Sequence, residues 1–285
     1  MTRNSPVCYD VIVTLPTLVV FYLLFPLYYL CTMKSKAINL HLPTCWAELT
    51  DSQLHLVFTL LARDISAAEV KTLCLCKWNG LKVLASLPGK RFITKMKGGS
   101  VVTLNARQIQ QAISVLDFLD TFPHIPVRIS KIGRHHAIAA DFQQVPFEQY
   151  LYVDNLFQGY LHTQSDELLL QIAQVLYACE NIKPDKAQLI GVFYWMASLK
   201  QFFAGLFSNF YKPVPSDVGN LLGNGQSDIY RQLSDSTNAL IRALTGGDIT
   251  KESAIMQMDT WRALTELDAK ARESESLKRA SKIKS

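Results

Sequence analysis

A run of 21 uncharged residues near the start of the chain, Val11–Cys31, most constrains what this chain can fold into. Its length matches the roughly 20 residues with which a helix spans a bilayer. Two prolines interrupt the run, and the second, Pro26, lies far enough inside to kink a helix. Lys34 and Lys36 follow directly, so a membrane helix here would leave the long C-terminal part in the cytoplasm.

The same run has a second interpretation, in which the protein begins at Met33. From Met33 onward the chain has the pattern of an ordinary soluble domain, and no small-x-small cleavage site follows the run. We therefore expect residues 1–32 to be an apolar leader that is either a mis-called start or a membrane anchor, and we favour the mis-called start.

Charge is distributed unevenly along the chain. Between Val70 and Leu116 there is no acidic residue, although the stretch contains eight lysines and arginines. Extended to Ala140, it has eleven basic and two acidic residues, a net charge of +9, which leaves −4 for the rest of a chain that totals +5. We infer a basic module attached to more acidic helices. Such a patch attracts anionic partners without identifying them.

Residues 33–145 are expected to form this basic module, an α+β region. The capping boxes Thr50–Gln53 and Ser66–Glu69 predict helix starts, and Asn105 predicts another. Strands joined by tight turns at Gly98-Gly99 and at Gly133 are predicted between and after these helices. The predicted strands cover residues 81–87, 91–96, 101–104, 127–132 and 136–141.

The remainder of the chain is expected to be helical. Residues 146–211 are predicted to form a helical core, in which Lys200 and Gln201 interrupt the most apolar helix and favour burial over a second membrane span. Residues 212–227 contain two prolines and three glycines and predict a linker, and residues 228–285 are expected to form a helical arm. The predicted fold class is α+β, predominantly α-helical, with a basic N-terminal region of short β-hairpins, a helical core and a C-terminal helical arm.

The sequence contains no recognised catalytic motif. Gly89-Lys90 lacks the first glycine and the Ser or Thr of a phosphate-binding loop, and GxSxG and HExxH patterns are absent. His135-His136 would face opposite sides of a strand, which disfavours a shared metal site. Cys74-x-Cys76 has neither redox nor zinc spacing and predicts core packing in a reducing compartment. We expect no enzymatic activity, no cofactor and no metal site.

The C-terminal arm offers one candidate binding surface. Met258, Trp261, Leu264 and Leu267 recur at helical spacing along it. Trp261 is expected to anchor a contact with a partner or with a second copy of the chain. Docking of this stripe on the chain's own body is the alternative.

The basic hairpin offers a second candidate surface. Lys90, Arg91, Lys95 and Lys97 are expected there with Phe92 between them, an arrangement that can contact phosphates. No recognised nucleic-acid-binding motif surrounds them. A solvated face, or a face that meets an acidic protein surface, is the alternative that the charge pattern alone favours.

Segments spread along the chain share a resemblance. They are WAELTDSQL (46–54), LDFLDTFP (116–123), YLYVDNLFQGYL (150–161), FYWMASLKQFF (193–203) and IRALTGGDITKESAIMQMDTWRALTELDAKARE (241–273). These resemble uncharacterised proteins encoded in phage and prophage regions of gut Bacteroidetes-type bacteria, and the likeness covers nearly everything after Met33. The resemblance implies a structural or virion-assembly role, in particular a tail-associated one, and supplies no catalytic residues.

We therefore expect a non-catalytic phage-type structural or assembly protein that acts through protein–protein contacts. Its expected partners are other phage structural or assembly proteins or a second copy of itself. One alternative is a nucleic-acid-binding accessory protein that uses the basic hairpin. The other is a membrane-tethered protein facing the cytoplasm, which requires residues 11–31 to be a membrane segment. The expected location is the host cytoplasm or the virion, with the inner membrane as the alternative.

Overall fold

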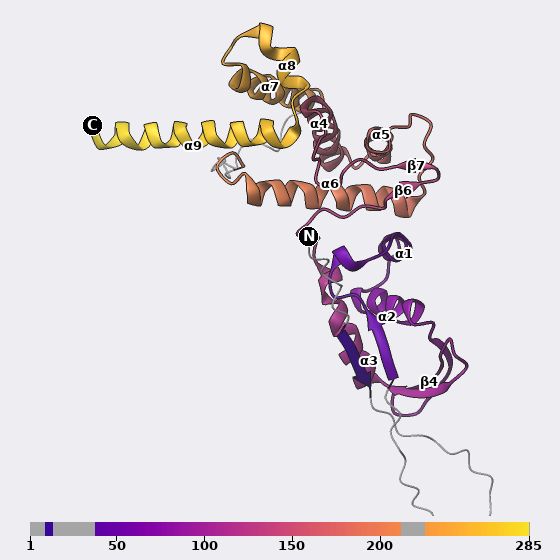
Figure 1. Ribbon diagram of the computed structural model, residues 1–285. Coiled ribbons are helices and arrows are strands. Elements are labelled where there is room, and N and C mark those ends of the chain that lie inside the picture. The colour runs from indigo at the N-terminus through magenta and orange to yellow at the C-terminus, as the bar shows by residue number, and fades with distance from the viewer. Residues whose placement is uncertain (1–8, 14–37, 212–225, 285) are drawn as a thin grey trace, which may run out of the picture. The chain divides into compact units, whose positions relative to one another are not determined.

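The computed structural model describes residues 9–13, 38–211 and 226–284, and the chain divides into two compact units. Unit 1 is Met1–Phe122 and unit 2 is Pro123–Ser285 (Figure 1). Helices predominate and the strands form small antiparallel sheets, so the predicted class, α+β and predominantly α-helical, is confirmed.

Unit 1 combines two α-helices, a three-stranded sheet and a further helix that continues as a 3-10 helix. Its elements are β1 (Tyr9–Val13), β2 (Ile38–Leu42), η1 (Trp46–Glu48), α1 (Asp51–Leu61), α2 (Ala67–Trp78), β3 (Lys82–Leu87), β4 (Arg91–Lys95), β5 (Val101–Asn105), α3 (Ala106–Ile113) and η2 (Ser114–Asp120). The three predicted helix starts are confirmed. Thr50, Ser66 and Asn105 each accept a hydrogen bond from the backbone N–H three residues on, within complete capping boxes.

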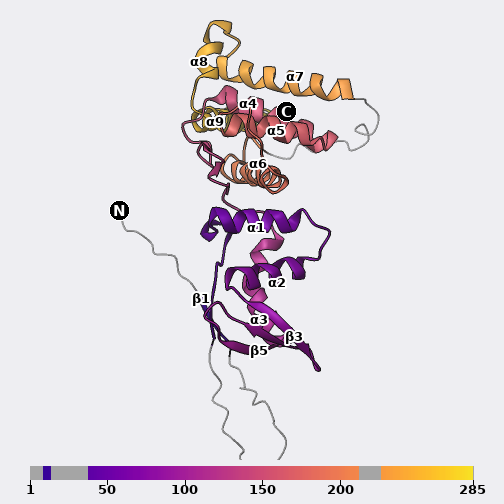
Figure 2. The same cartoon turned by 90° about the vertical axis from the view of Figure 1, so that its right-hand side faces the viewer.

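The sheet has the strand order β3-β4-β5, and both connections are antiparallel hairpins. Phe92 and Thr94 pair with Leu104 and Val102 on one face, which is covered. Figures 1 and 2 show α2 and α3 lying over this face. Because side chains alternate along a strand, the residues between them point to the opposite face, and that face is the candidate site described below.

The first residues of the apolar run are a strand. Val11–Val13 belong to β1, which pairs with β2 so that Val13 lies opposite Ile38. A helix over the whole run is therefore wrong at its start, where Val-Ile-Val favours a strand because β-branched side chains suit a pleated backbone. Residues 14–31 lie outside the described residues. Within the predicted leader, the structure describes only residues 9–13, which pair with β2.

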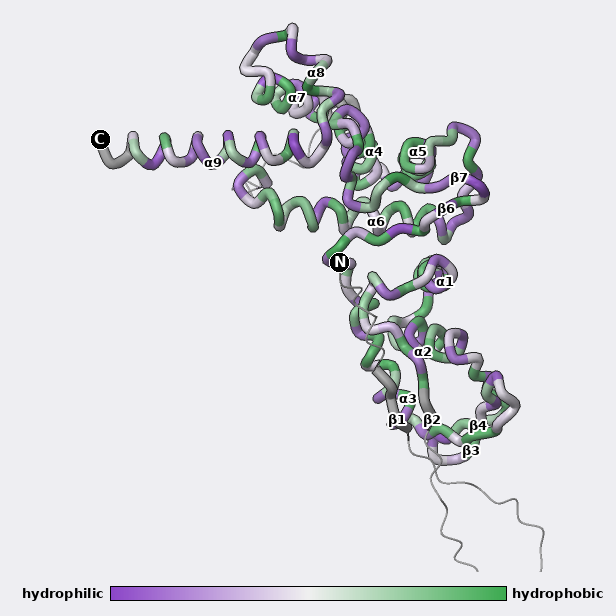
Figure 3. Tube along the Cα trace, in the orientation of Figure 1, coloured by the Kyte–Doolittle hydropathy of each residue, from purple (hydrophilic) through white to green (hydrophobic). Residues whose placement is uncertain are grey.

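Unit 2 is almost entirely helical. Its elements are β6 (Lys131–Ile132), β7 (His135–His136), α4 (Phe147–Thr163), α5 (Asp166–Leu176), α6 (Lys186–Leu206), α7 (Gln226–Thr245), η3 (Ile249–Lys251), α8 (Glu252–Met256) and α9 (Thr260–Lys284). Its core is aromatic, with Trp195, Phe142 and Phe203 fully buried among side chains from α4, α5 and α9. Hydrophobic residues dominate along α6, whereas hydrophilic ones recur along α9 (Figure 3).

The boundary between the two units falls earlier than the sequence suggested. Residues 123–145 were predicted to belong to the basic module, but they pack into the core of unit 2 through Ile132, Phe142 and Val145. Trp195 Nε1 donates to Ala140 O at 2.7 Å, and the Tyr177 hydroxyl donates to Ile129 O at 2.7 Å. Buried indole and phenol groups need such acceptors, and an irregular backbone segment supplies them.

The C-terminal helices are not an arm detached from the helical core. The predicted helical arm is broken between α8 and α9, because this segment bonds to residues at the start of α4 and just before it. Phe147 N donates to Met258 O at 2.8 Å, and both Thr260 N and Thr260 Oγ1 donate to Val145 O. The first turns of α9 then bury Ala263, Leu264 and Leu267 in the core of unit 2. The predicted linker, residues 212–227, lies outside the described residues except for its last two.

Among the described residues, α6 is the one helix long and apolar enough to span a membrane by length and composition. Its Trp195, Met196 and Leu199 are fully buried in the core of unit 2. Lys200 Nζ lies 2.8 Å from Asp154 Oδ1 of α4. The two groups form an ion pair, but they do not meet the geometry of a hydrogen bond. This packing supports the interpretation of α6 as a core helix.

Candidate functional site

The face of the sheet turned away from α2 and α3 carries the basic residues that the sequence singled out. On β4 it presents Arg91, Ile93 and Lys95, which alternate with the covered Phe92 and Thr94. Arg91 and Lys95 are both exposed. We call this surface, with the two turns at its ends, the basic sheet face.

A lysine that sequence reasoning missed completes this face. Lys82 of β3 lies directly opposite Lys95 in the register of the two strands. Side chains in such a pair start about 5 Å apart, and like charges directly opposite each other are destabilising. The hairpin turn alone does not reveal this pair, because Leu87 pairs with Arg91 and a bulge between Val83 and Ala85 then shifts the register so that Lys82 meets Lys95.

The turn between β3 and β4 holds two more cations. Lys90 has a φ of 55°, a left-handed conformation that costs a residue with a side chain about 1 kcal/mol or more, and Gly89 precedes it with a φ of 77°. Arg91 Nε donates to Pro88 O at 3.1 Å, and this hydrogen bond holds the Nε end of the guanidinium group at the turn. Lys90 and Arg91 therefore sit together at one end of the basic sheet face.

Lys97 lies at the other end, beside the last residues of α2. Gly80 ends α2 with a φ of 60°, and Leu81 N donates to Cys76 O at 2.7 Å, as in a Schellman motif. A Cβ built on Gly80 would lie 2.9 Å from Lys97 Cβ, so a glycine is needed for this close approach. The turn from Met96 to Ser100 is thereby held against α2, whose last turn contributes Lys77.

Within unit 1, seven of the eight basic residues between Val70 and Leu116 are exposed. They are Lys77, Lys82, Lys90, Arg91, Lys95, Lys97 and Arg107. None of them forms an ion pair with another residue that the structure describes. The stretch thus lacks acidic residues in its sequence, and its exposed cations have no ion-pair partner among the residues that the structure describes.

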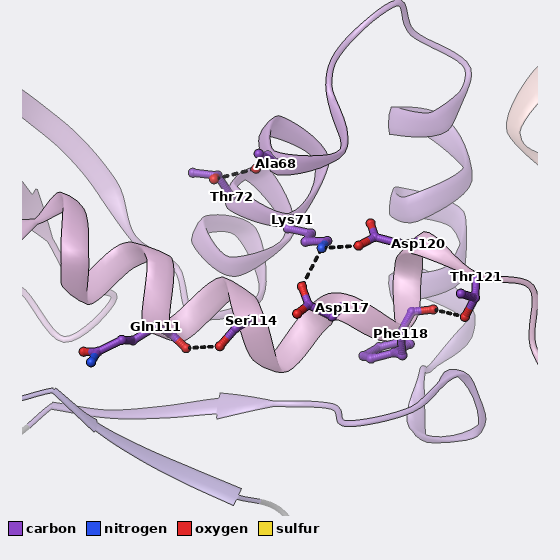
Figure 4. A network of polar contacts seen from close by, with 9 residues as sticks. All are labelled: Ala68, Lys71, Thr72, Gln111, Ser114, Asp117, Phe118, Asp120 and Thr121. Carbon is purple, nitrogen blue, oxygen red and sulfur yellow. Dashed lines mark hydrogen bonds and ion pairs between the residues drawn. The ribbon is translucent and has the colours of Figure 1, made fainter.

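The eighth basic residue, Lys71, shows the opposite arrangement (Figure 4). It is buried on α2, and its Nζ lies 2.6 Å from Asp117 Oδ1 and 2.5 Å from Asp120 Oδ2 of η2. Burial lowers the pKa of Lys71, but the hydrogen bonds and charges of the two aspartates outweigh it, so the pKa is raised overall. Lys71 is thus a neutralised structural charge.

The three basic residues predicted to extend this module, Arg128, Lys131 and Arg134, belong to unit 2. Arg128 points into that unit, where its Nε donates to Ile138 O at 2.6 Å and its guanidinium lies over the ring of Trp195. Lys131 and His136 pair across the short hairpin β6–β7, which confirms the predicted turn at Gly133. Among the described residues there is no cluster of three or more His, Cys, Asp or Glu that could hold a metal ion.

The apolar stripe predicted to bind a partner is used inside unit 2. Leu264 and Leu267 are 1% and 3% exposed. Trp261 Nε1 donates to Asp141 O at 2.7 Å, and the indole contacts Phe202, Phe203 and Phe207. Met258 packs partly buried against the same core. The assignment of these four residues to partner binding is therefore corrected: they close the chain's own core, as the alternative held.

Unit 2 also contains a buried pair of tyrosine hydroxyls and a cavity. The Tyr150 and Tyr211 hydroxyls are 2.6 Å apart, and burial raises the pKa of both phenols, so this pair stays protonated. A cavity of about 350 Å³ between α4, α5 and α7 is lined by apolar and neutral polar side chains, with Asn155 Nδ2 donating to Thr237 Oγ1 at 3.1 Å. Neither feature brings together the groups of a recognised reaction.

Cys74 confirms the core packing predicted for it. It is fully buried on α2, and burial raises the pKa of its thiol to about 12, so the thiol stays protonated and unreactive near neutral pH. Cys76 is partly buried, and burial raises its pKa as well.

Comparison of the chain with models of protein families, with curated proteins and with solved structures found no match.

Proposed function

We propose that this protein binds nucleic acid through the basic sheet face of unit 1, by contacts to the phosphate backbone. The observation that carries the proposal is the set of five exposed cations on this face and its turns, with Lys82 set opposite Lys95 and without an acidic partner among the described residues. The five are Lys82, Lys90, Arg91, Lys95 and Lys97. Phosphate groups supply the missing negative charge, and contacts of this kind bind without reading base sequence.

The register of the sheet supports this proposal over a merely solvated face. A solvated face gains nothing from placing two lysines opposite each other, because that pairing is destabilising in the free protein. The strained φ of Lys90 adds a second cost at the same surface. Features that lower stability and share one kind of charge favour a binding role.

The experiment is a titration of a fluorescently labelled nucleic acid with the full chain at several salt concentrations. Each phosphate contact to a duplex contributes about −0.9 to the slope of log K against log salt. Five contacts would give a slope of about −4.5, or a loss of roughly 500-fold between about 50 and 200 mM salt. Binding that is absent at about 50 mM salt, or that does not change with salt, would overturn the proposal.

Single substitutions locate the contacts, and the chain offers a matched control. Lys95→Gln should make the slope shallower by about 0.9, and Lys97→Gln should do the same. Arg63→Gln is the control, because Arg63 is an exposed basic residue of the same unit that lies beyond the end of α1 and away from the sheet. A slope that changes equally for Lys95→Gln and Arg63→Gln would contradict the assignment to the sheet.

A structural or assembly role of the phage type is a second candidate, favoured by the far half of α9. No side chain from Arg272 to Ser281 is buried, and Leu277 is 71% exposed. A helix segment without tertiary contacts is marginal in water, which favours a partner for it. The test compares the full chain with one ending at Ala271 in nuclease-treated pull-downs from source cells. Loss of a near-stoichiometric virion protein from the shorter chain is expected, and its retention would remove this candidate.

A further inference from the structure

Resting on the proposed function, we infer that the nucleic acid is a B-form duplex, and that the basic sheet face straddles a groove with a phosphate row at each end of β4. This inference depends on where the cations lie along the strands and on what lies between them.

The cations gather at the two ends of the face. Lys90 and Arg91 lie at the β3–β4 turn, whereas Lys82, Lys95 and Lys97 lie at the opposite end, near the β4–β5 turn. The middle of the face is uncharged. Its three strands there present the cross-strand set Ala85, Ile93 and Thr103, which the register places side by side.

The separation of the two ends suits the groove of a duplex. Arg91 and Lys95 are four residues apart on one strand, which corresponds to about 13 Å at roughly 3.3 Å per residue. The major groove of B-DNA is about 12 Å wide, with a phosphate row along each side. The two charged ends can therefore meet the two rows while the uncharged middle faces the groove. A single strand offers one row of phosphates and no fixed spacing to match.

The face also lacks what single-strand binding requires. Proteins that hold single strands without sequence preference stack successive bases on aromatic side chains. In unit 1, Phe92 points to the covered side of the sheet, and the other described aromatic residues lie outside its three strands. They are Tyr9, Trp46, Phe58, Trp78, Phe118 and Phe122. No described aromatic residue occupies an outward-facing position of β3, β4 or β5. A flexible single strand of nucleic acid would lose conformational entropy on this surface without gaining stabilisation from base stacking on aromatic side chains.

The experiment measures the affinity of the full chain for a labelled DNA duplex of about 20 base pairs and for the single strand of the same sequence, at about 100 mM salt. The duplex is expected to bind at least tenfold more tightly. Arg91→Gln and Lys95→Gln, one at each end, should each make the duplex salt slope shallower by about 0.9. Arg63→Gln, the control outside this face, should leave the slope unchanged.

Equal or tighter binding of the single strand would overturn the duplex inference while leaving the proposed function in place. A slope that responds to Lys95→Gln but not to Arg91→Gln would overturn the straddling geometry. Failure of both nucleic acids to bind at about 50 mM salt would instead overturn the proposed function itself. These outcomes are distinguishable because each is measured on the same protein with the same two labelled DNAs.

Discussion

The lysines of unit 1 lie in two opposite kinds of environment. Lys71 is buried and neutralised by two aspartates that hydrogen-bond to it, whereas Lys82 and Lys95 lie exposed and opposite each other, with no ion pair to any described residue. The first arrangement joins α2 to η2 and therefore serves folding. The second is unfavourable for folding, and we propose that these exposed charges serve binding instead.

Some charged residues of α9 also have partners within unit 2. Arg279 bonds to Glu275 one turn earlier, and Lys270 Nζ donates to Ala243 O at 2.5 Å. Asp268 accepts hydrogen bonds from the backbone N–H groups of Asn209 and Phe210. These groups have partners within unit 2, and the predictions that follow separate the two kinds of charge by their effects on folding.

The largest effect is expected when Lys71 loses its partners. Asp117→Asn combined with Asp120→Asn leaves a buried ammonium without a carboxylate. Because the two aspartates are themselves partly exposed, solvent compensates part of the loss, and we expect the free energy of unfolding of unit 1 to fall by about 3 kcal/mol. Hydrogen exchange followed by mass spectrometry reports this on unit 1 peptides of the full chain. Lys71→Met, which removes the buried charge instead, should change the free energy of unfolding by less than about 1 kcal/mol. An equal loss in both variants would break the comparison.

Leu264 and Leu277 test which part of α9 serves the fold. Leu264→Ala opens a cavity in the core of unit 2, and we expect a loss of about 3 kcal/mol in the free energy of unfolding of that unit. Leu277→Ala on the same helix should change it by less than about 0.5 kcal/mol, because that side chain is mostly exposed. Thermal or denaturant unfolding checks both. A small effect of Leu264→Ala would indicate that the first turns of α9 do not pack in the core of unit 2.

Asp268 should make unit 2 sensitive to acid. Burial raises the pKa of this carboxyl, but hydrogen bonds from Asn209 and Phe210 outweigh it and lower the pKa below the ordinary value of 3.8. The carboxylate's contribution is therefore present above about pH 3.8 and is lost as the pH falls through the lower, folded-state pKa. Asp268→Asn should remove about 1–2 kcal/mol near neutral pH and flatten this part of the acid unfolding curve. An unchanged curve would show that these hydrogen bonds do not stabilise the fold.

The smallest effect has the opposite sign. Lys82→Thr removes the like-charge pair with Lys95 and places a β-branched residue in a strand, so unit 1 should gain about 0.2–1 kcal/mol. Denaturant unfolding at low salt is the measurement, since salt screens the repulsion. If Lys82→Thr destabilised unit 1, the lysine pair would be structural, and the contrast with Lys71 would disappear.

Local signals predicted much of this fold. Thr50, Ser66 and Asn105 each mark a helix start through contacts within four residues, and Gly99 and Gly133 each mark a hairpin by a positive φ. The errors arose where distant segments decide the structure. The break at Met258–Thr260 depends on Val145 and Phe147, more than 110 residues earlier, and no local pattern reveals that pairing.

The candidate site was predictable to a similar extent. Lys90, Arg91, Lys95 and Lys97 were recognisable from charge in a hairpin pattern, and the structure places all four at the face or its turns. Lys82 required the register, and the pairing of Lys71 with Asp117 and Asp120 required the packing of α2 on η2. The apolar stripe from Met258 to Leu267 was ambiguous in the sequence because helices use the same spacing for a core face and for a docking face.

The most direct test of the account is a lysine acetylation footprint of the full chain, read by mass spectrometry with and without a saturating DNA duplex. The account predicts that duplex binding slows acetylation of Lys82, Lys95 and Lys97, while the exposed Lys183 and Lys186 of unit 2 react at unchanged rates. Equal protection of lysines in both units, or protection of unit 2 alone, would contradict a binding site on the basic sheet face.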